Sequence, residues 1–207
     1  MSNLLNNQVI LITGGLSVLA DKLSEEIVNL GGKVCISDVD SKFSIKDNIL
    51  HIEESTETWQ GSARILEKVL EKFGKLDGVV TAVNINRLER IDNLTFEDWS
   101  SVINFNLKGT FNIVRQIAPL FRKQRSGRII TIPSETALFG KSNHTVNSAA
   151  ASGILGFTKV VAKDLGKYGV TSNSVITFFD NRDMDSKKEI SEIISRFELP
   201  SISNETL

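Results

Sequence analysis

The sequence predicts a doubly wound α/β fold, in which one parallel sheet is covered by helices on both faces. Short apolar, β-branched runs alternate along the chain with longer segments of helical spacing. Most of these runs are apolar throughout, as in strands buried on both sides. Such alternation favours right-handed crossovers and the strand order 3-2-1-4-5-6. The candidate strands are residues 9–13, 33–37, 48–52, 77–83, 128–132 and 170–178.

Helical segments separate the candidate strands. Thr95 with Asp98 is typical of a capping pair at a helix start. Gly74 suits a helix end, because glycine adopts the left-handed conformation without strain. The two longest helices are expected over residues 105–123 and 146–167. Before Gly74, the apolar residues at helical spacing are Ala63, Leu66, Val69, Leu70 and Phe73.

The last part of the chain predicts one further helix. Ser186 and Glu189 form a candidate capping box, and Pro200 ends the helix. No seventh strand is expected after it. The apolar stripe of this helix consists of Ile190, Ile193, Ile194 and Phe197.

Composition sets the class of protein. A chain of 207 residues predicts one domain over residues 1–207. Its net charge of -1 gives no field that would attract nucleic acid, so no nucleic-acid partner is expected. No apolar run approaches the roughly 20 residues of a membrane helix, and no signal peptide is recognisable. We therefore expect a cytoplasmic protein without membrane contact. Cys35, the single cysteine, has no partner for an internal disulfide.

Four motifs follow one another along the chain. Residues 9–20 contain a Thr-Gly turn after the first strand, residues 73–80 lead into the fourth strand, residues 99–111 carry Asn106, and residues 127–134 end in a serine. In this order they resemble the short-chain dehydrogenase/reductase family, and within it the 3-oxoacyl-acyl-carrier-protein reductases. The resemblance implies a Rossmann-like domain that binds a nicotinamide dinucleotide at the carboxyl ends of its strands.

The glycine-rich turn departs from the family pattern T-G-x-x-x-G-x-G. Gly14 and Ser17 are compatible with it, but Val18 and Ala20 stand at the two later glycine positions. Val18 places methyl groups where phosphate oxygens approach the backbone. Asp38 stands where NAD-preferring members bind the adenosine ribose with an acid. We expect the dinucleotide to bind weakly or not at all, and to be NAD if it binds through Gly14, Ser17 and Asp38.

Two further segments that resemble cofactor-binding motifs are also altered. Residues 81–84 read Thr-Ala-Val-Asn where the family has Asn-Asn-Ala-Gly, a motif that braces the sheet and lines the cofactor. Residues 53–55 read Glu-Glu-Ser close to the position where an acid meets the adenine, one residue out of register. The loss of the first motif favours weak binding.

The resemblance implies a catalytic set of Asn, Ser, Tyr and Lys. Asn106 and Ser134 are retained, but counting from Ser134 the Tyr and Lys positions fall on Asn147 and Ala151. An amide does not titrate in water and a methyl group donates no hydrogen bond, so the general acid and the ribose-binding cation are missing. His144 is the nearest other acid, although a single loop histidine is ordinarily a surface residue. No residues have metal-ligand spacing, and no metal is expected.

These replacements favour a non-catalytic member that acts through protein–protein contact, including as a silent subunit beside a complete paralogue. The alternative is an NAD(P)-dependent oxidoreductase that acts on a carbonyl or alcohol with altered catalytic residues. A regulator that binds nucleotide without turnover is a third class. The predicted helices 105–123 and 146–167 carry apolar residues on more than one face, and the resemblance implies that they pair between subunits. We expect a homodimer or heterodimer through these two helices.

Overall fold

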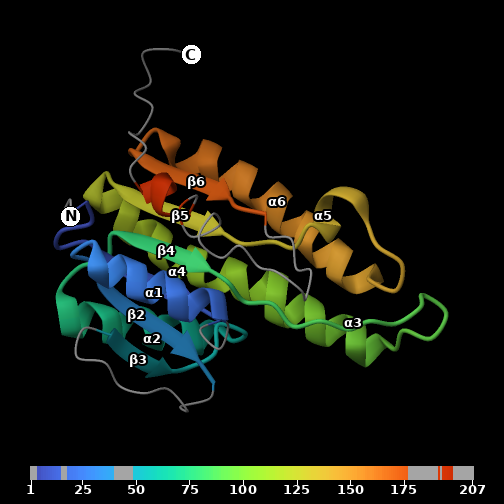
Figure 1. Ribbon diagram of the computed structural model, residues 1–207. Helices are drawn as coiled ribbons and strands as arrows, with labels where there is room; N and C mark the ends of the chain where they lie inside the picture. The colour runs from blue at the N-terminus through green and yellow to red at the C-terminus, as the bar shows by residue number, and fades with distance from the viewer. Residues whose placement is uncertain (1–3, 15–17, 40–48, 177–190, 192, 198–207) are drawn as a thin grey trace.

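The computed structural model describes residues 4–14, 18–39, 49–176, 191 and 193–197. Within them, six parallel strands form one sheet with the order β3-β2-β1-β4-β5-β6, which confirms the predicted topology (Figure 1). Two strands end earlier than expected: β4 at Thr81 rather than residue 83, and β6 at Ser174 rather than residue 178. The strands are β1 Val9–Thr13, β2 Lys33–Asp38, β3 Ile49–Glu53, β4 Gly78–Thr81, β5 Gly127–Thr131 and β6 Val170–Ser174.

The two long predicted helices are present. Residues 146–167 correspond to α6, and residues 105–123 lie within a longer continuous helical stretch that begins at Phe96 and contains a π-helical segment, η1. Thr95 accepts a hydrogen bond from the Asp98 backbone N–H, and Gly74 ends α2 with a φ of 72°, so both predicted caps are confirmed. The helices are α1 Val18–Asn29, α2 Trp59–Phe73, α3 Phe96–Val102, η1 Ile103–Lys108, α4 Gly109–Gln124, α5 Thr136–Phe139 and α6 Thr145–Gly166.

The sheet is the middle layer of three (Figure 1). Helix α1 covers one face together with helical residues 193–197, and α2, α4 and α6 cover the other face. Ile193, Ile194 and Phe197 are buried in the first layer, as the predicted apolar stripe requires. Ile190, Ser186, Glu189, Pro200 and the place of any seventh strand lie outside the described residues. No helix in the described part of the chain is both long enough and apolar enough to span a membrane.

A row of hydroxyl side chains crosses the sheet near the carboxyl ends of five strands. Ser37, Thr13, Thr81, Thr131 and Ser174 are consecutive register partners on β2, β1, β4, β5 and β6. Thr131 Oγ1 lies 2.7 Å from Ser174 Oγ and 2.9 Å from Thr158 Oγ1 of α6. The carboxyl edge of the sheet is therefore polar even where it is buried, and in doubly wound folds this edge is the one that binds ligands.

Candidate functional site

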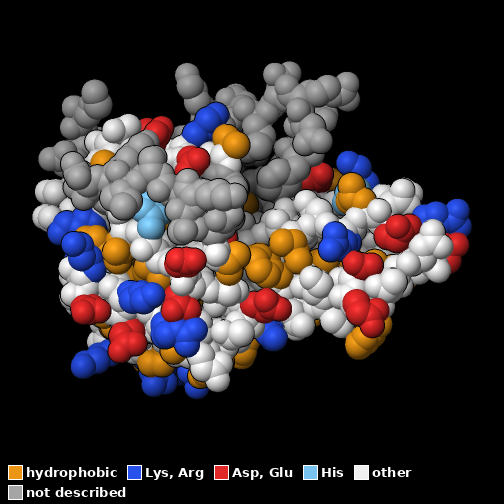
Figure 2. Space-filling view, turned by 90° about the horizontal axis from the view of Figure 1, so that it is seen from below, with side chains coloured by type: hydrophobic (Ala, Val, Ile, Leu, Met, Phe, Trp, Pro, Cys, Tyr) orange, Lys and Arg blue, Asp and Glu red, His pale blue; other side chains and the backbone are white. Residues whose placement is uncertain are grey.

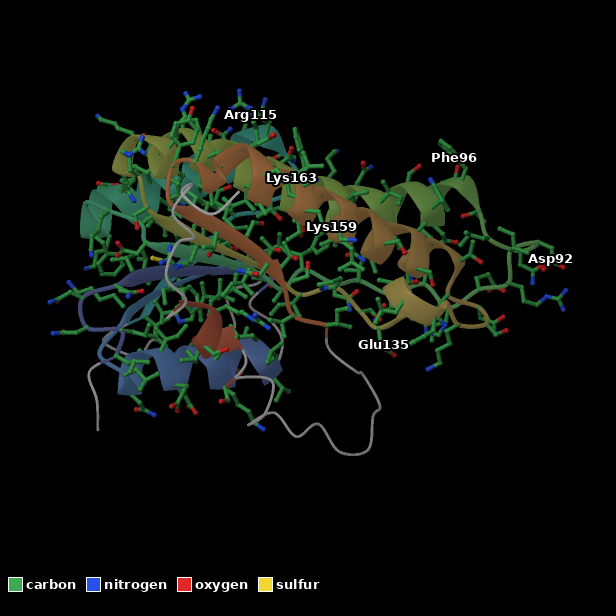
Figure 3. The ribbon with its side chains drawn as sticks, turned by 90° about the horizontal axis from the view of Figure 1, so that it is seen from above. Asp92, Phe96, Arg115, Glu135, Lys159 and Lys163 are labelled. Atoms are coloured by element: carbon green, nitrogen blue, oxygen red, sulfur yellow. The ribbon has the colours of Figure 1, made fainter. Side chains whose placement is uncertain are left out.

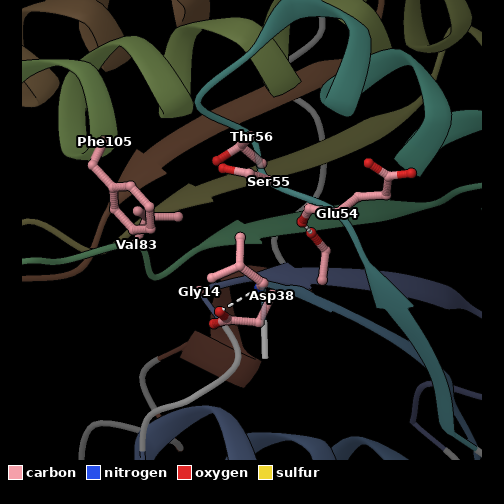
Figure 4. A pocket seen from close by; sticks show the side chains of 9 residues that line it. Gly14, Asp38, Glu54, Ser55, Thr56, Val83 and Phe105 are labelled. Carbon is pink, nitrogen blue, oxygen red and sulfur yellow. Dashed lines mark hydrogen bonds between the residues drawn. The ribbon is translucent and has the colours of Figure 1, made fainter. Parts of the chain in front are cut away.

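A hollow of about 210 Å³ opens at the carboxyl ends of β1, β2 and β3 (Figure 4). Phe105 and Val83 lie on one side of the hollow, and residues 54–56 lie on the other. The lining residues are Gly14, Ser37, Asp38, Val39, Glu54, Ser55, Thr56, Val83 and Phe105.

Gly14 is required by backbone packing. Its φ is +78°, and a Cβ built on it would lie 2.6 Å from the Val83 backbone nitrogen. Its own N–H donates to the Ser37 carbonyl at 3.1 Å. The glycine therefore has a structural explanation that does not depend on a bound phosphate.

Val18 is the first residue of α1 and its side chain is 63% exposed. Its two methyl groups therefore stand in solvent at the helix N-terminus, the position where a helix can bind an anion. Ser17, the predicted neighbour in the turn, lies outside the described residues.

Asp38 lies at the end of β2, where its Oδ1 accepts a hydrogen bond of 2.6 Å from the Val39 N–H. It lines the hollow, as expected for an acid that would bind a ribose. The acid predicted near the adenine is used differently. Glu54 forms a two-point ion pair with Arg64 of α2, at 2.7 and 2.8 Å. The hydrogen bond from Arg64 is the main reason that the pKa of Glu54 lies below its ordinary value.

Asn147, at the predicted tyrosine position, is buried and bound to the loop that follows β4. Its Oδ1 accepts a hydrogen bond from the Arg87 N–H at 3.1 Å. Its Nδ2 donates to the Ile85 carbonyl at 3.1 Å and to Asn86 Oδ1 at 2.6 Å. All three interactions link the start of α6 to residues 85–87, two through the loop backbone and one through the Asn86 side chain.

Asn106 binds the same loop from η1. Its Oδ1 accepts from the Ile85 N–H at 2.8 Å, and its Nδ2 donates to the Ile85 carbonyl at 2.9 Å. A longer contact of 3.4 Å joins Nδ2 to Asn84 Oδ1. We call Asn106, Asn147 and the Ile85 peptide between them the asparagine clamp.

Ser134 and Ala151 complete the predicted set. Ser134 Oγ donates to Glu135 Oε2 at 3.0 Å and accepts from the Thr136 N–H at 3.3 Å. Ala151 is 5% exposed on α6 and presents only a methyl group. His144 Nδ1 lies 2.8 Å from the Ser142 carbonyl, within its own loop. Among the described residues, no group of three or more His, Cys, Asp or Glu side chains is placed to hold a metal.

Several contacts of this site leave no signal in the sequence. Phe105, which lines the hollow, and Arg64, the partner of Glu54, are not among the predicted site residues, whereas Val83 falls within the predicted cofactor-lining segment 81–84. Hydrophobic periodicity assigns Phe105 only to a helix and cannot show that its ring reaches the hollow. The loop 85–87 carries no motif of its own, so nothing in the sequence indicated that it would bind two asparagines.

Comparison with known proteins agrees with this geometry. The family model described as short chain dehydrogenase matches residues 8–192. The chain belongs to the short-chain dehydrogenase family. A 3-oxoacyl-[acyl-carrier-protein] reductase of Synechocystis is 33% identical over 168 residues, which cover 81% of this chain and 62% of that relative. The chain thus spans less than two thirds of that relative's length.

A 3-oxoacyl-[acyl-carrier-protein] reductase of Thermotoga maritima is 29% identical to this chain over 197 residues. These cover 88% of this chain and 78% of the relative. The crystal structure of a 3-ketoacyl-(acyl-carrier-protein) reductase from Brucella melitensis complexed with NADH has the same fold. It superposes with a TM-score of 0.80 at 22% identity, covering 84% of this chain and 76% of that one.

Proposed function

We propose that this short-chain dehydrogenase relative does not catalyse a reaction and acts through protein–protein contact, including as a silent subunit beside a complete paralogue. One observation carries the proposal: the side chain at the tyrosine position, Asn147, is an amide whose oxygen and nitrogen are both bound to the loop 85–87. It therefore has neither an acidic proton nor a free donor for a substrate carbonyl.

The neighbouring positions support the same proposal. Ala151 provides no charge with which to lower the pKa of an acid or to bind a ribose. Asn106 and Ser134 are retained, but Asn106 is engaged in the asparagine clamp and Ser134 bonds to Glu135 and Thr136. Removing a positioned general acid alone lowers a rate by about 10²–10⁴-fold.

Weak or absent binding of a dinucleotide is part of the proposal. Val83 and Phe105 side chains line the hollow, and the Glu54 carboxylate is held by Arg64. Any dinucleotide that binds is expected to be NAD, because Asp38 can accept hydrogen bonds from both ribose hydroxyls.

The contact surface that we propose lies on the two long helices. We define the α4–α6 face as the exposed residues of η1, α4 and α6. They include Lys108, Phe111, Arg115, Arg122, Lys159, Val160 and Lys163. Phe111 and Val160 are 44% and 56% exposed on this face, and neither is covered by the chain's own sheet. Apolar side chains left exposed on packed helices favour a partner. We propose a homodimer or a heterodimer through this face, which should bury at least about 1,200 Å² in total.

The second candidate is an NAD(P)-dependent oxidoreductase that acts on a carbonyl or alcohol. It is favoured by the retained Ser134 and Asn106 and by relatives that are named as reductases. In such an enzyme, Ser134 would bind the substrate oxygen and another acid would replace the tyrosine. A nucleotide-binding regulator without turnover would need the hollow but not the acid.

Titration with NADH and NADPH by calorimetry separates these functions. The proposal expects a dissociation constant in the millimolar range or weaker, which is no more than about -4 kcal/mol. Micromolar binding of either cofactor would contradict it. Val18→Gly is the informative variant, because tighter binding is expected if the exposed methyl groups obstruct the phosphates. Val28→Gly, the same change at a half-buried position further along α1 and outside the turn, is the matched control.

A further inference from the structure

The charge of the α4–α6 face is predominantly positive, and Asp164 is the one acid on η1, α4 and α6. Glu135 is the only acidic residue between Asp98 and Asp164, whereas the same stretch holds nine lysines and arginines. Figure 3 shows Arg115 on α4 and Lys159 and Lys163 on the neighbouring α6. By contrast, acidic and basic side chains are interspersed where β3 and α2 lie (Figure 2). The exposed cations of the face are Lys108, Arg115, Arg122, Lys159 and Lys163.

These five cations are not neutralised within the described part of the chain. None of the ion pairs formed there includes them. Arg115 lies over the ring of Trp59, 5.6 Å from its centroid, which orients the guanidinium without neutralising it. Lys108, Arg115 and Arg122 are spaced by seven residues, so they follow one side of the helical stretch. The cations are therefore available to a partner.

An apolar strip lies between the cations of the two helices. The rings of Phe111 and Phe157 meet edge to face across α4 and α6, with centroids 6.2 Å apart. A Cβ built on Gly153 would lie 2.9 Å from Leu107, which shows how closely η1 approaches α6. A Cβ built on Gly156 would meet no atom within 4 Å, so the surface there is open. An apolar centre with a charged rim is the usual anatomy of a protein interface.

We propose that the α4–α6 face binds a different protein chain, whose helical surface has an apolar centre flanked by Asp and Glu. This inference rests on the proposed function and names the chemistry of its partner. In a two-fold homodimer each face meets its own copy. Asp164, the one acid of η1, α4 and α6, would then oppose the five cations of the other copy. This repulsion between like charges disfavours the homodimer, whereas an acidic partner chain is attracted to the face.

Nucleic acid is a poorer occupant of the same face. Cations bind the phosphates of nucleic acid. Here, however, the exposed side chains of Phe111 and Val160 lie among the cations. A phosphate backbone would cover these apolar side chains without offering them an apolar contact. An acidic protein surface satisfies both parts of the face, the charged rim and the apolar strip.

A charge-reversed copy of the chain can serve as the acidic probe. The variant Arg115→Glu/Lys159→Glu/Lys163→Glu keeps the helices and the apolar strip but reverses the rim. Light scattering is measured for the wild type, for the variant and for an equimolar mixture, at low and high salt. The control variant Lys33→Glu/Lys72→Glu/Lys141→Glu changes charge equally at exposed positions outside the face. Circular dichroism melting establishes that each variant is folded.

The proposal expects a monomeric wild type and a 1:1 complex in the mixture. The mixed pair should bind at least about tenfold tighter than the wild type binds itself, and should weaken with salt. The control mixture should not associate. A stable wild-type homodimer, a mixture that stays monomeric, or tight binding of the wild type to duplex DNA at physiological salt would each overturn the inference. The cofactor titration tests the proposed function separately. Failure of the proposed function can therefore be told apart from failure of this inference.

Discussion

Asn106 and Asn147 donate hydrogen bonds to one and the same carbonyl oxygen, that of Ile85, at 2.9 and 3.1 Å. One amide comes from η1 and the other from α6, so the clamp ties two helices to the loop that follows β4. Both asparagines are about 4% exposed. At the tyrosine position, the chain has therefore gained a contact between buried elements in place of an acid.

The first prediction concerns the stability supplied by this clamp. Asn147→Ala leaves the Arg87 N–H without its acceptor and removes a donor from Asn86 Oδ1. The expected loss is about 1–3 kcal/mol of unfolding free energy, the usual effect of leaving a buried polar group unpaired. Urea unfolding followed by fluorescence measures it. Asn104→Ala is the matched control, because the Asn104 side chain makes no hydrogen bond within the described residues, and an equal loss there would contradict the clamp.

The second prediction concerns restoration of the missing acid. Asn147→Tyr with Ala151→Lys should not give turnover above background across a panel of carbonyl substrates. The new tyrosine would break the three hydrogen bonds of Asn147, and Val18 would still stand at the N-terminus of α1. Oxidation of NADH and of NADPH, each followed by absorbance, is the measurement. The non-catalytic proposal fails if the wild type itself turns over a substrate and Ser134→Ala abolishes that activity.

The sheet could be predicted because its signals are local. Each strand is a short apolar run, and Gly74 and Thr95 mark helix boundaries with their own residue chemistry. The start of the long helix was harder to predict. Residues 103–108 continue α3 as a π-helical turn, so the stretch is helical from Phe96 onward, whereas the periodicity indicated a helix from residue 105.

The sequence suggests which residues form the candidate site, but it does not show their hydrogen-bond partners. Counting from Ser134 places Asn147 and Ala151 at the Tyr and Lys positions that the family resemblance implies. The hydrogen bonds of Asn147, however, reach residues about sixty positions earlier in the chain. Likewise, Glu54 and Arg64 meet only because α2 folds back beside the end of β3. Contacts of this kind depend on tertiary packing, which a single sequence does not encode as a local pattern.

The third prediction separates packing from backbone conformation at three glycines. Gly14→Ala should cost at least about 2 kcal/mol, because its φ is positive and its Cβ would collide with the Val83 backbone. Gly74→Ala should cost about 1 kcal/mol, since its φ is also positive but the space around it is open. Gly156→Ala, in a helix with open space, should stabilise by about 0.5–1 kcal/mol. Equal effects of Gly14→Ala and Gly74→Ala in urea unfolding would refute the close contact with Val83.

The last prediction concerns pH and the Glu54–Arg64 pair. The folded pKa of Glu54 lies below its ordinary value of 4.5, mainly through the hydrogen bond from Arg64. A lowered folded pKa means that the stabilisation by this group is fully present above pH 4.5 and is lost as the pH falls through the folded pKa. Glu54→Gln should therefore destabilise the protein at neutral pH, and the difference from the wild type should shrink on acidification. Urea unfolding from pH 7 to about pH 3 measures this difference. Arg64→Gln should behave in the same way, because the pKa of Glu54 then returns toward its ordinary value. Glu71→Gln, at an exposed position on the same helix, is the control and should show no such trend. A constant difference between wild type and Glu54→Gln over the whole range would show that the ion pair does not contribute to folding.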